Sequence, residues 1–579
     1  MKKIVNVIII ASLLMTGVWS CNEEKWLTEE VFSTFAPENS YRTAGQMRQA
    51  LNYLYNELRS AHWEINGDEL TTLHMGDIAY GGTDYPDAKF NNIRTYFVPT
   101  GGMAGVFWER GYRSIANANV ILNRLADCNA TVTEKTAFEG EALFFRAFWY
   151  NALANVYGAV PVYTDEVTAA RDDYVRAPRA DVYNQARADL EKTITLLLDV
   201  DEVNDGRINK QAAQHLLTEV YISLGNYPKA IETATSIINH PQMALMTTRF
   251  GSRASEPGDP YWDLFQHRNQ NRKGSGNKES ILVFQFEHLN SGSSYGYNFP
   301  RQGFPFFNNL RIANIPGAQT VPAGTATGFQ PFREFPVSMG GRGIGVIRPT
   351  DYFSETVWKV DGTNDYRNAP YTIVRDYRIE NNSAGSLVFG EWFVADGHFD
   401  RLNFDRKLRE WYPFMMKFAR TDSELTEDVF RTTGLTLSGF GERLLLYTAM
   451  GNPVANSSMK DEYLFRLGGT YLLRAEAYIK NNNPSAALAD INALRVRANA
   501  TPAQLSEINL DYLMDEQMRE RYFEDFRMVT LMRMGTFVER MRKCHPRGVN
   551  VDDHHNLLPI QNSEIERNKG VKWENNPGY

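Results

Sequence analysis

The sequence predicts a mainly α-helical protein, in which tetratricopeptide-like helical repeats form a scaffold and a large, irregular, aromatic-rich lobe rests on it. Three observations support this fold class. Residues 209–240 read as a helical hairpin, a similar hairpin returns at residues 471–498, and the chain between them is rich in Gly, Pro, Asn and aromatic residues. Because one hairpin cannot bury its apolar faces alone, we expect several to stack into a continuous scaffold.

The two hairpins share a pattern of small and aromatic residues. In the first, apolar residues recur at helical spacing until Gly225–Pro228 breaks the run, and a second apolar stripe then begins. The spacing of Leu216, Tyr221 and Ala230 reappears in the second hairpin as Leu473, Tyr478 and Ala487. Small residues on both helices allow the two axes to pack closely, which is typical of tetratricopeptide units.

Composition limits the possible partners and cysteine chemistry. The chain has 579 residues, of which 43% are hydrophobic and 12% aromatic, enough for a large core. The net charge of −8 disfavours nucleic acid and anionic lipid as main partners. Three cysteines cannot form a disulfide framework. We interpret Cys128 and Cys544 as buried small hydrophobes.

Residues 1–20 have the pattern of a secretory signal. Lys2 and Lys3 precede an apolar run from Ile4 to Val18 that is short for a spanning helix. Ser20 before Cys21 predicts cleavage there and lipid attachment to the Cys21 side chain. An ordinary signal peptide, cleaved elsewhere, is the alternative.

The rest of the chain, residues 21–579, is predicted to form a single body. Helical patterns fill about 37–240 and 461–542, and an extended tail covers 543–579. Within the first part, the chain predicts helices over Pro37–His62, Trp108–Leu125, a segment capped by Thr131 and Glu134 and stopped by Gly158, and Asp181–Leu198. The irregular lobe covers about 241–460, and its short alternating runs predict strands at Ile281–Phe286 and Tyr371–Tyr377.

A series of short motifs follows one family pattern nearly from end to end. They are Cys21-Asn22 leading to Trp26-Leu27, Trp108-Glu109-Arg110-Gly111-Tyr112, Phe145-Arg146-Ala147, Tyr157-Gly158-Ala159-Val160-Pro161, residues 491–498, Glu516–Gly535, and the ending LLPIQNSEIERNKGVKWENNPGY. Their order resembles the SusD/RagB family of outer-membrane nutrient-binding lipoproteins. Asn22-Glu23-Glu24 also resembles the acidic export tag of surface-exposed Bacteroidetes lipoproteins.

The resemblance implies a function, a location and partners. It implies a non-enzymatic, lipid-anchored outer-membrane protein facing the cell exterior, whose irregular lobe faces the ligand. Such a protein binds an oligosaccharide or polysaccharide and delivers it to a SusC-like TonB-dependent β-barrel transporter. Peptide binding within the same family is one alternative. A helical glycoside hydrolase is another, which would need two carboxylates facing each other across a cleft. No cofactor is predicted, and a structural calcium ion stays open.

Sugar binding needs flat apolar ring faces together with a few polar groups. Aromatic-rich stretches outside the predicted helices supply candidates, because loops on a rigid support commonly carry binding function. The candidate ligand-binding residues are Tyr80, Asp84, Tyr85, Asn92, Tyr96, Tyr295, Tyr297, Phe304, Phe307 and Trp392. The alternative for each ring is that it fills the core of the lobe.

Other polar patterns are interpreted as structural. Glu139 and Glu141 lie in a predicted helix and read as solvated or capping charges rather than an acid/base pair. Asp552–His555 contains metal-ligating residue types, but adjacent histidines rarely point at one ion. We interpret this stretch as a solvated polar turn, and the sequence predicts no metal site.

Overall fold

The structure is a computed structural model. It describes residues 40–63, 76–82, 92–286, 299–307, 310, 321–323, 326–328, 343–377, 379, 390–398, 409–418, 460–545 and 550–579. The predicted signal peptide and Cys21 lie outside these ranges. No helix in the described part of the chain is both long enough and apolar enough to cross a membrane.

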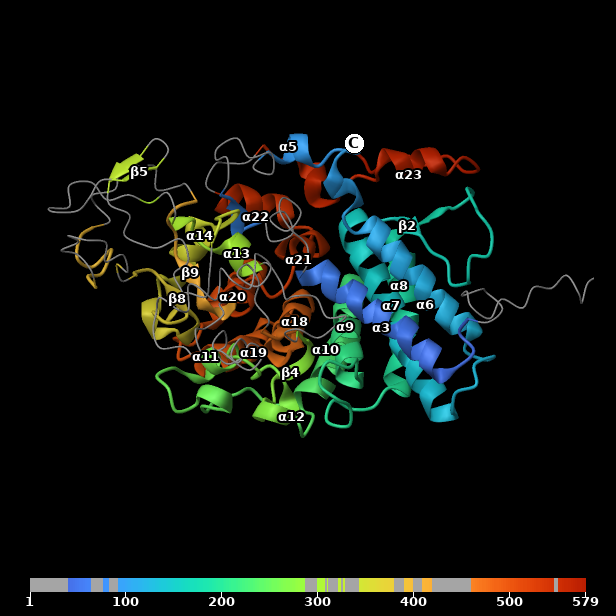
Figure 1. The fold of residues 1–579 in the computed structure, drawn as a ribbon, viewed down its shortest axis with the longest axis horizontal. Helices are drawn as coiled ribbons and strands as arrows, with labels where there is room; N and C mark the ends of the chain where they lie inside the picture. Colours follow the sequence, from blue (N-terminus) through green and yellow to red (C-terminus); the bar gives the residue numbers. More distant parts are fainter. Residues whose placement is uncertain are drawn as a thin grey trace, which may run out of the picture.

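The first helical group occupies one end of the molecule (Figure 1). Its helices pack in chain order, each against the next, from α6 to α10, with α3 against α6 and α7. They are α3 (Ala44–Trp63), α6 (Trp108–Arg124), α7 (Val132–Tyr157), α8 (Arg179–Leu196), α9 (Lys210–Ser223) and α10 (Tyr227–Ile238).

The second helical group comes more than two hundred residues later and continues the same stack. Helix α10 packs against α18, so the intervening chain leaves the scaffold and returns to it. The helices are α18 (Leu467–Lys480), α19 (Pro484–Arg497), α20 (Leu510–Arg521), α21 (Arg527–Met534) and α22 (Phe537–Cys544). The mainly helical, repeat-based fold is therefore confirmed.

Both hairpins use the same local devices at their turns. Gly225 and Asn482 adopt left-handed backbone with φ of 74° and 56°, which reverses the chain after the first helix. The next helix then starts with an asparagine N-cap: Asn226 accepts from the Lys229 N–H and Asn483 from the Ala486 N–H. Proline follows in the first turn of both helices, so the two helices begin with the same combination of an asparagine cap and a proline.

Helix α7 shows the predicted N-terminal and C-terminal signals. Thr131 accepts a hydrogen bond from the Glu134 N–H at 3.3 Å, and Glu134 accepts from the Thr131 N–H at 2.9 Å, which completes a capping box. Gly158 ends the helix with a φ of 74°.

Replacing Thr131 with alanine is expected to lower the free energy of unfolding by about 1 kcal/mol, because the first turn of α7 loses one satisfied N–H. Urea unfolding followed by circular dichroism measures the change. Thr133→Ala is the matched control, since Thr133 is exposed and lies outside the capping box. Equal losses in the two variants would contradict the role of the cap.

Within the described ranges, the strands form five two-stranded antiparallel ribbons. The ribbons pair β1 (Ala79–Gly81) with β7 (Ile347–Pro349), β2 (Val160–Pro161) with β3 (Arg176–Ala177), β4 (Ser280–Phe284) with β10 (Glu462–Arg466), β5 (Val321–Ala323) with β6 (Ala326–Gly328), and β8 (Ile373–Val374) with β9 (Phe414–Met415). The predicted strand at Ile281–Phe286 is confirmed as β4, while only two residues of Tyr371–Tyr377 are strand. The second scaffold region begins with β10 rather than a helix, because its apolar residues pair with β4.

Short helices lie in the connections. They are α5 (Ile93–Tyr96), α11 (Pro260–Asp263), α12 (Arg272–Ser275), α13 (Phe299–Gly303), α14 (Asp351–Ser354) and α23 (Asn562–Arg567). Single 3₁₀ turns are η2 (Gly102–Gly105), η3 (Gly251–Arg253), η6 (Thr356–Trp358), η7 (Gly362–Asn364), η8 (Tyr366–Asn368), η10 (Met416–Phe418), η11 (Leu505–Glu507) and η12 (Asp553–Asn556). The tail predicted to be extended thus contains α23 and η12.

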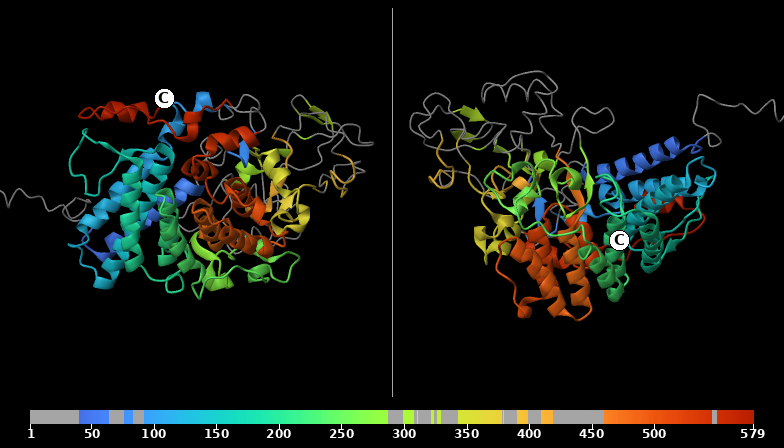
Figure 2. Two further views of the ribbon diagram at one scale, coloured as in Figure 1. Left: turned by 180° about the vertical axis from the view of Figure 1, so that it is seen from behind. Right: turned by 90° about the horizontal axis from the view of Figure 1, so that it is seen from below.

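The last residues of the chain lie across the first helical group, where Figures 1 and 2 show α23 beside its helices. The Leu558 N–H donates to the Val156 carbonyl at 2.7 Å, and the Asn576 amide donates to the Tyr157 carbonyl at 2.9 Å. These carbonyls belong to the last turn of α7 and have no partner inside the helix. The Trp573 indole donates to the Tyr174 carbonyl at 2.8 Å.

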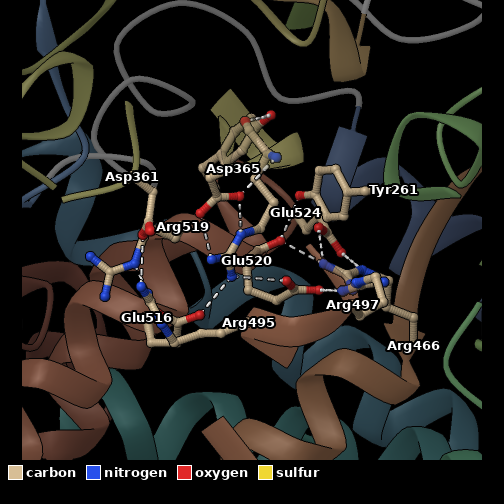
Figure 3. A network of polar contacts seen from close by, with 12 residues as sticks. Tyr261, Asp361, Asp365, Arg466, Arg495, Arg497, Glu516, Arg519, Glu520 and Glu524 are labelled. Atoms are coloured by element: carbon tan, nitrogen blue, oxygen red, sulfur yellow. Dashed lines mark hydrogen bonds and ion pairs between the residues drawn. The ribbon is translucent and has the colours of Figure 1, made fainter. Parts of the chain in front are cut away.

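A buried network of charged side chains joins the lobe to the second helical group (Figure 3). Glu516 and Glu520 are four residues apart and lie on one side of α20, while Glu524 lies in the turn that follows this helix. Glu516 contacts Arg367 of the lobe at 2.6 Å, and Glu520 contacts Arg466 at 2.6 Å. Further members are Lys417, Arg495, Arg497, Arg519, Glu279, Asp361 and Asp365.

Opposite charges lower the pKa of Glu524 and of Asp77 despite burial. Burial alone raises the pKa of Glu524, but the charges of Arg466 and Lys417 outweigh it and lower the pKa to about 2. In the same way, Asp77 pairs with Arg527 and Arg540, each at 2.7 Å, and its pKa falls to about 2.

Candidate functional site

The candidate ligand-binding residues fall into three groups in the structure. Asp84, Tyr85, Tyr295 and Tyr297 lie outside the described residues. Tyr80, Tyr96, Phe304 and Phe307 are buried, with at most 9% of their surface exposed. Trp392 is 41% exposed, and Asn92 is half-buried at the start of α5.

The buried candidates fill space between elements. Tyr80 lies on β1, where its ring is 5.5 Å from His545 and 5.7 Å from the Arg348 guanidinium. Phe304 packs edge-on against Phe414 of β9. In this arrangement none of these rings presents an open face to a ligand, which favours the packing alternative for them.

Trp392 precedes Phe393, which belongs to an aromatic cluster with Phe307, Tyr377 and Trp411. Phe393 is fully buried with its ring 4.6 Å from Trp411, and Phe307 lies 5.2 Å from Tyr377. The two neighbours Trp392 and Phe393 therefore point in opposite directions, one to solvent and one into the cluster. Phe307 contributes to this cluster through contacts with Tyr377 and Trp411.

Carboxylates hold the turn that carries Trp392, residues 390–398, in one conformation. Asp376 accepts hydrogen bonds from the Val394 and Ala395 N–H groups at 2.7 and 2.9 Å, and Asp396 accepts from the Trp392 N–H at 2.6 Å. Gly390 and Gly397 open and close the turn with φ of 85° and 77°. The indole is thus exposed on a rigid support, and little ordering is needed when a ligand meets it.

Polar side chains lie on the same turn as Trp392. Glu391 has 43% of its side chain exposed and pairs with His398 at 2.6 Å, while Asp396 is exposed beside it. An exposed indole with carboxylates on the same turn suits a sugar ring, because the apolar C–H face of a sugar stacks on an aromatic ring and its hydroxyls can donate to carboxylates. The sequence signal for this arrangement was the Gly390-Glu391-Trp392-Phe393 run. The roles of Tyr377 and Trp411 were missed, since they carry no local signal.

A cavity lies at the N-terminus of α6. This cavity of about 660 Å³ is lined mainly by charged and polar residues, among them Glu109, Arg110, Arg113, Glu564 and Arg567. Its aromatic member, Trp108, is 5% exposed and uses its indole N–H to bind Glu564 at 3.2 Å. The cavity therefore lacks the exposed ring face that residues 390–398 provide.

The predicted structural carboxylates are ion-paired. Glu139 pairs with Lys192, and Glu141 pairs with Arg48 at 2.8 Å. Glu141 is only 5% exposed, so the interpretation of this residue as a solvated charge was wrong. Its side chain extends from α7 toward Arg48 of α3 and toward Arg207. Cys128 and Cys544 are buried free thiols, as predicted.

Comparison with known proteins identifies the family. Residues 278–579 match the SusD family, and residues 88–222 match a family described as starch-binding associating with outer membrane. SusD-like protein P25 of Formosa agariphila is 24% identical over 98% of this chain and 97% of its own length. SusD-like protein P2 of the same organism is 26% identical over 52% of this chain and about half, 56%, of its own length.

Solved structures agree in fold. A laminarin binding SusD-like protein matches with a TM-score of 0.62 and 21% identity, covering 93% of this chain and all of that one. Surface glycan-binding protein A from Bacteroides thetaiotaomicron in complex with laminarihexaose matches with a TM-score of 0.63 and 19% identity, covering 92% of this chain and 99% of that one. The family model spans more than half of the residues here, and this chain belongs to the SusD family.

Proposed function

We propose that this protein binds a glycan at the cell surface through the turn carrying Trp392. The observation that carries the proposal is the exposed indole of Trp392, held on a rigid turn in a chain of the SusD family. The names of the similar structures, a laminarin binding protein and a laminarihexaose complex, support a glycan as the ligand class.

The proposal includes an anchor and a partner. Cys21 would carry the lipid that holds the protein to the outer membrane, facing the exterior. A SusC-like TonB-dependent β-barrel transporter would receive the glycan. A stable contact with such a barrel should bury more than about 1,000 Å². Purification from detergent-solubilised membranes without any large β-barrel protein would contradict the partnership.

Isothermal titration of residues 22–579 against plant, host and microbial polysaccharides tests the binding. Trp392→Ala is expected to weaken binding of the recognised glycan about tenfold or more, because the stacking face is lost. Trp392→Tyr keeps an aromatic face and should retain most of the affinity. Val360→Ala, which shortens an exposed side chain elsewhere in the lobe, should change nothing.

The outcomes separate the alternatives. Binding of one glycan class that is insensitive to Trp392→Ala would move the site to another surface. Silence across the panel would contradict glycan binding by the isolated chain and favour a peptide ligand. Release of shorter sugars during the titration would instead favour a glycoside hydrolase.

A further inference from the structure

The 3₁₀ turn η12 near the C-terminus brings three potential metal ligands together. Asp552, His554 and His555 each offer one ligand atom, and these atoms all lie within 4.8 Å of one another. The two imidazole rings are 4.0 Å apart between centroids. Asp552 and His555 are three residues apart, a spacing that a 3₁₀ turn places on one side. His555 is 1% exposed, so the interpretation of this stretch as a solvated turn was wrong for that residue.

We propose that Asp552, His554 and His555 form a binding site for a divalent transition-metal ion such as Zn²⁺. Two imidazoles and one carboxylate are a ligand set that zinc accepts, and three protein ligands leave a fourth position for water or a further ligand. In tetrahedral zinc sites neighbouring ligand atoms lie about 3.4 Å apart, so the side chains must close by roughly 1 Å. Asp552 and His554 are half-buried, so neither side chain is enclosed on all sides.

The backbone around His555 offers the hydrogen bond that metal-ligating histidines commonly make. Its Nδ1 lies 3.1 Å from the Asp552 carbonyl oxygen. When Nδ1–H donates to that carbonyl, Nε2 keeps a lone pair for the ion. The Asp552 N–H also lies 2.8 Å from Nδ1 and favours the opposite tautomer. A bound ion therefore selects the His555 tautomer with a proton on Nδ1. In that tautomer, His555 no longer accepts the hydrogen bond from the Asp552 N–H.

Aromatic rings hold both imidazoles in place. The Tyr579 ring meets His554 edge-on at 4.6 Å, and the Phe97 ring lies 6.1 Å from His555. Tyr579 is itself fixed, since its hydroxyl donates to the Leu557 carbonyl at 2.8 Å. This packing limits the rotation of the imidazoles and favours their joint approach to one ion.

Arg94 competes with the metal for Asp552. Its guanidinium donates to both Asp552 oxygens, at 2.8 and 2.6 Å, from the start of α5. Both side chains are about half exposed, at 52% and 41%, and exposed ion pairs of this kind contribute little stability. An incoming dication therefore displaces Arg94 into solvent. The site consequently makes an unusual prediction: removing a neighbouring residue should strengthen metal binding.

Titration of residues 22–579, without an affinity tag, with ZnCl₂ in a non-chelating buffer tests the site by calorimetry. We expect one zinc ion per chain. His554→Asn and Asp552→Asn should each weaken binding at least tenfold, whereas Arg94→Gln should strengthen it several-fold. Asp553→Asn is the matched control, because Asp553 is exposed and pairs with Arg542 instead. Far-ultraviolet circular dichroism of the metal-free variants confirms that each one folds.

Three results would overturn the proposal. The first is that the parent protein binds no zinc. The second is that the double variant His554→Asn, Asp552→Asn still binds one zinc ion per chain. The third is that Arg94→Gln binds zinc more weakly than the parent protein. Electron paramagnetic resonance of the Cu²⁺-loaded protein gives a second readout, since two imidazole nitrogens should split the copper signal. None of these measurements involves a glycan, so their outcome is independent of the proposed function.

Discussion

Replacing Arg466 with alanine is expected to lower the free energy of unfolding by about 3–5 kcal/mol. The Arg466 guanidinium is fully buried and contacts Glu520 and Glu524, each at 2.6 Å. Removing it leaves two buried carboxylates with fewer opposing charges, and the cost of burying charge is then no longer offset. Urea unfolding followed by tryptophan fluorescence measures the loss.

The matched control is an ion pair that water surrounds. Lys572 pairs with Glu574 at 2.7 Å, but the two side chains are 85% and 82% exposed. Lys572→Ala should therefore leave the unfolding midpoint unchanged within error. If Arg466→Ala behaved like Lys572→Ala, the network in Figure 3 would not stabilise the fold.

The protein is expected to lose several kcal/mol of stability as the pH falls from about 4.5 to 2, because buried carboxylates must then take up protons. The pKa values of Asp77, Glu476 and Glu524 are each lowered to about 2. Burial opposes this shift, but neighbouring arginines and lysines outweigh it. A carboxyl group whose pKa is lower in the folded state stabilises the protein at pH values above its unfolded-state pKa, which is near 4. That stabilisation disappears as the pH falls toward the folded-state pKa.

Urea unfolding at a series of pH values between 7 and 2 tests this expectation. Each shift of about two units corresponds to about 2–3 kcal/mol. Raising the salt concentration should leave the acid transition in place, since buried pairs are screened much less than surface charges. A midpoint that stays constant down to pH 2.5, or an acid transition that salt removes, would contradict the assignment to Asp77, Glu476 and Glu524.

The helical part of the fold could be predicted because its signals are local. Asn226 and Asn483 cap their own helices, and Gly158 ends α7 through its own backbone conformation. Each of these features depends on residues within one turn, so spacing in the sequence was sufficient. The strand β10 was missed because Glu462–Arg466 becomes a strand only by pairing with β4, from which it is separated by much of the lobe.

The site could be predicted only in part, because exposure depends on distant partners. Phe304 is buried by Phe414, and Phe393 is buried by Trp411, contacts that no local pattern encodes. Composition identified the aromatic stretches but not which ring would remain open. The acidic spacing of Glu516, Glu520 and Glu524 is also visible in the sequence. Such a stripe normally indicates a solvated helix face, and only the arginines from α19 and the lobe make it interior.

The contacts of the last residues with α7 link the completion of this helix to the end of the chain. In the part of the chain that the structure describes, the Val156 and Tyr157 carbonyls find their donors in Leu558 and Asn576, about four hundred residues further along. These two hydrogen bonds can form only after the final segment has been synthesised, and contacts this distant in sequence slow folding. A chain cut short before Leu557 would lack both donors and would leave the last turn of α7 without them.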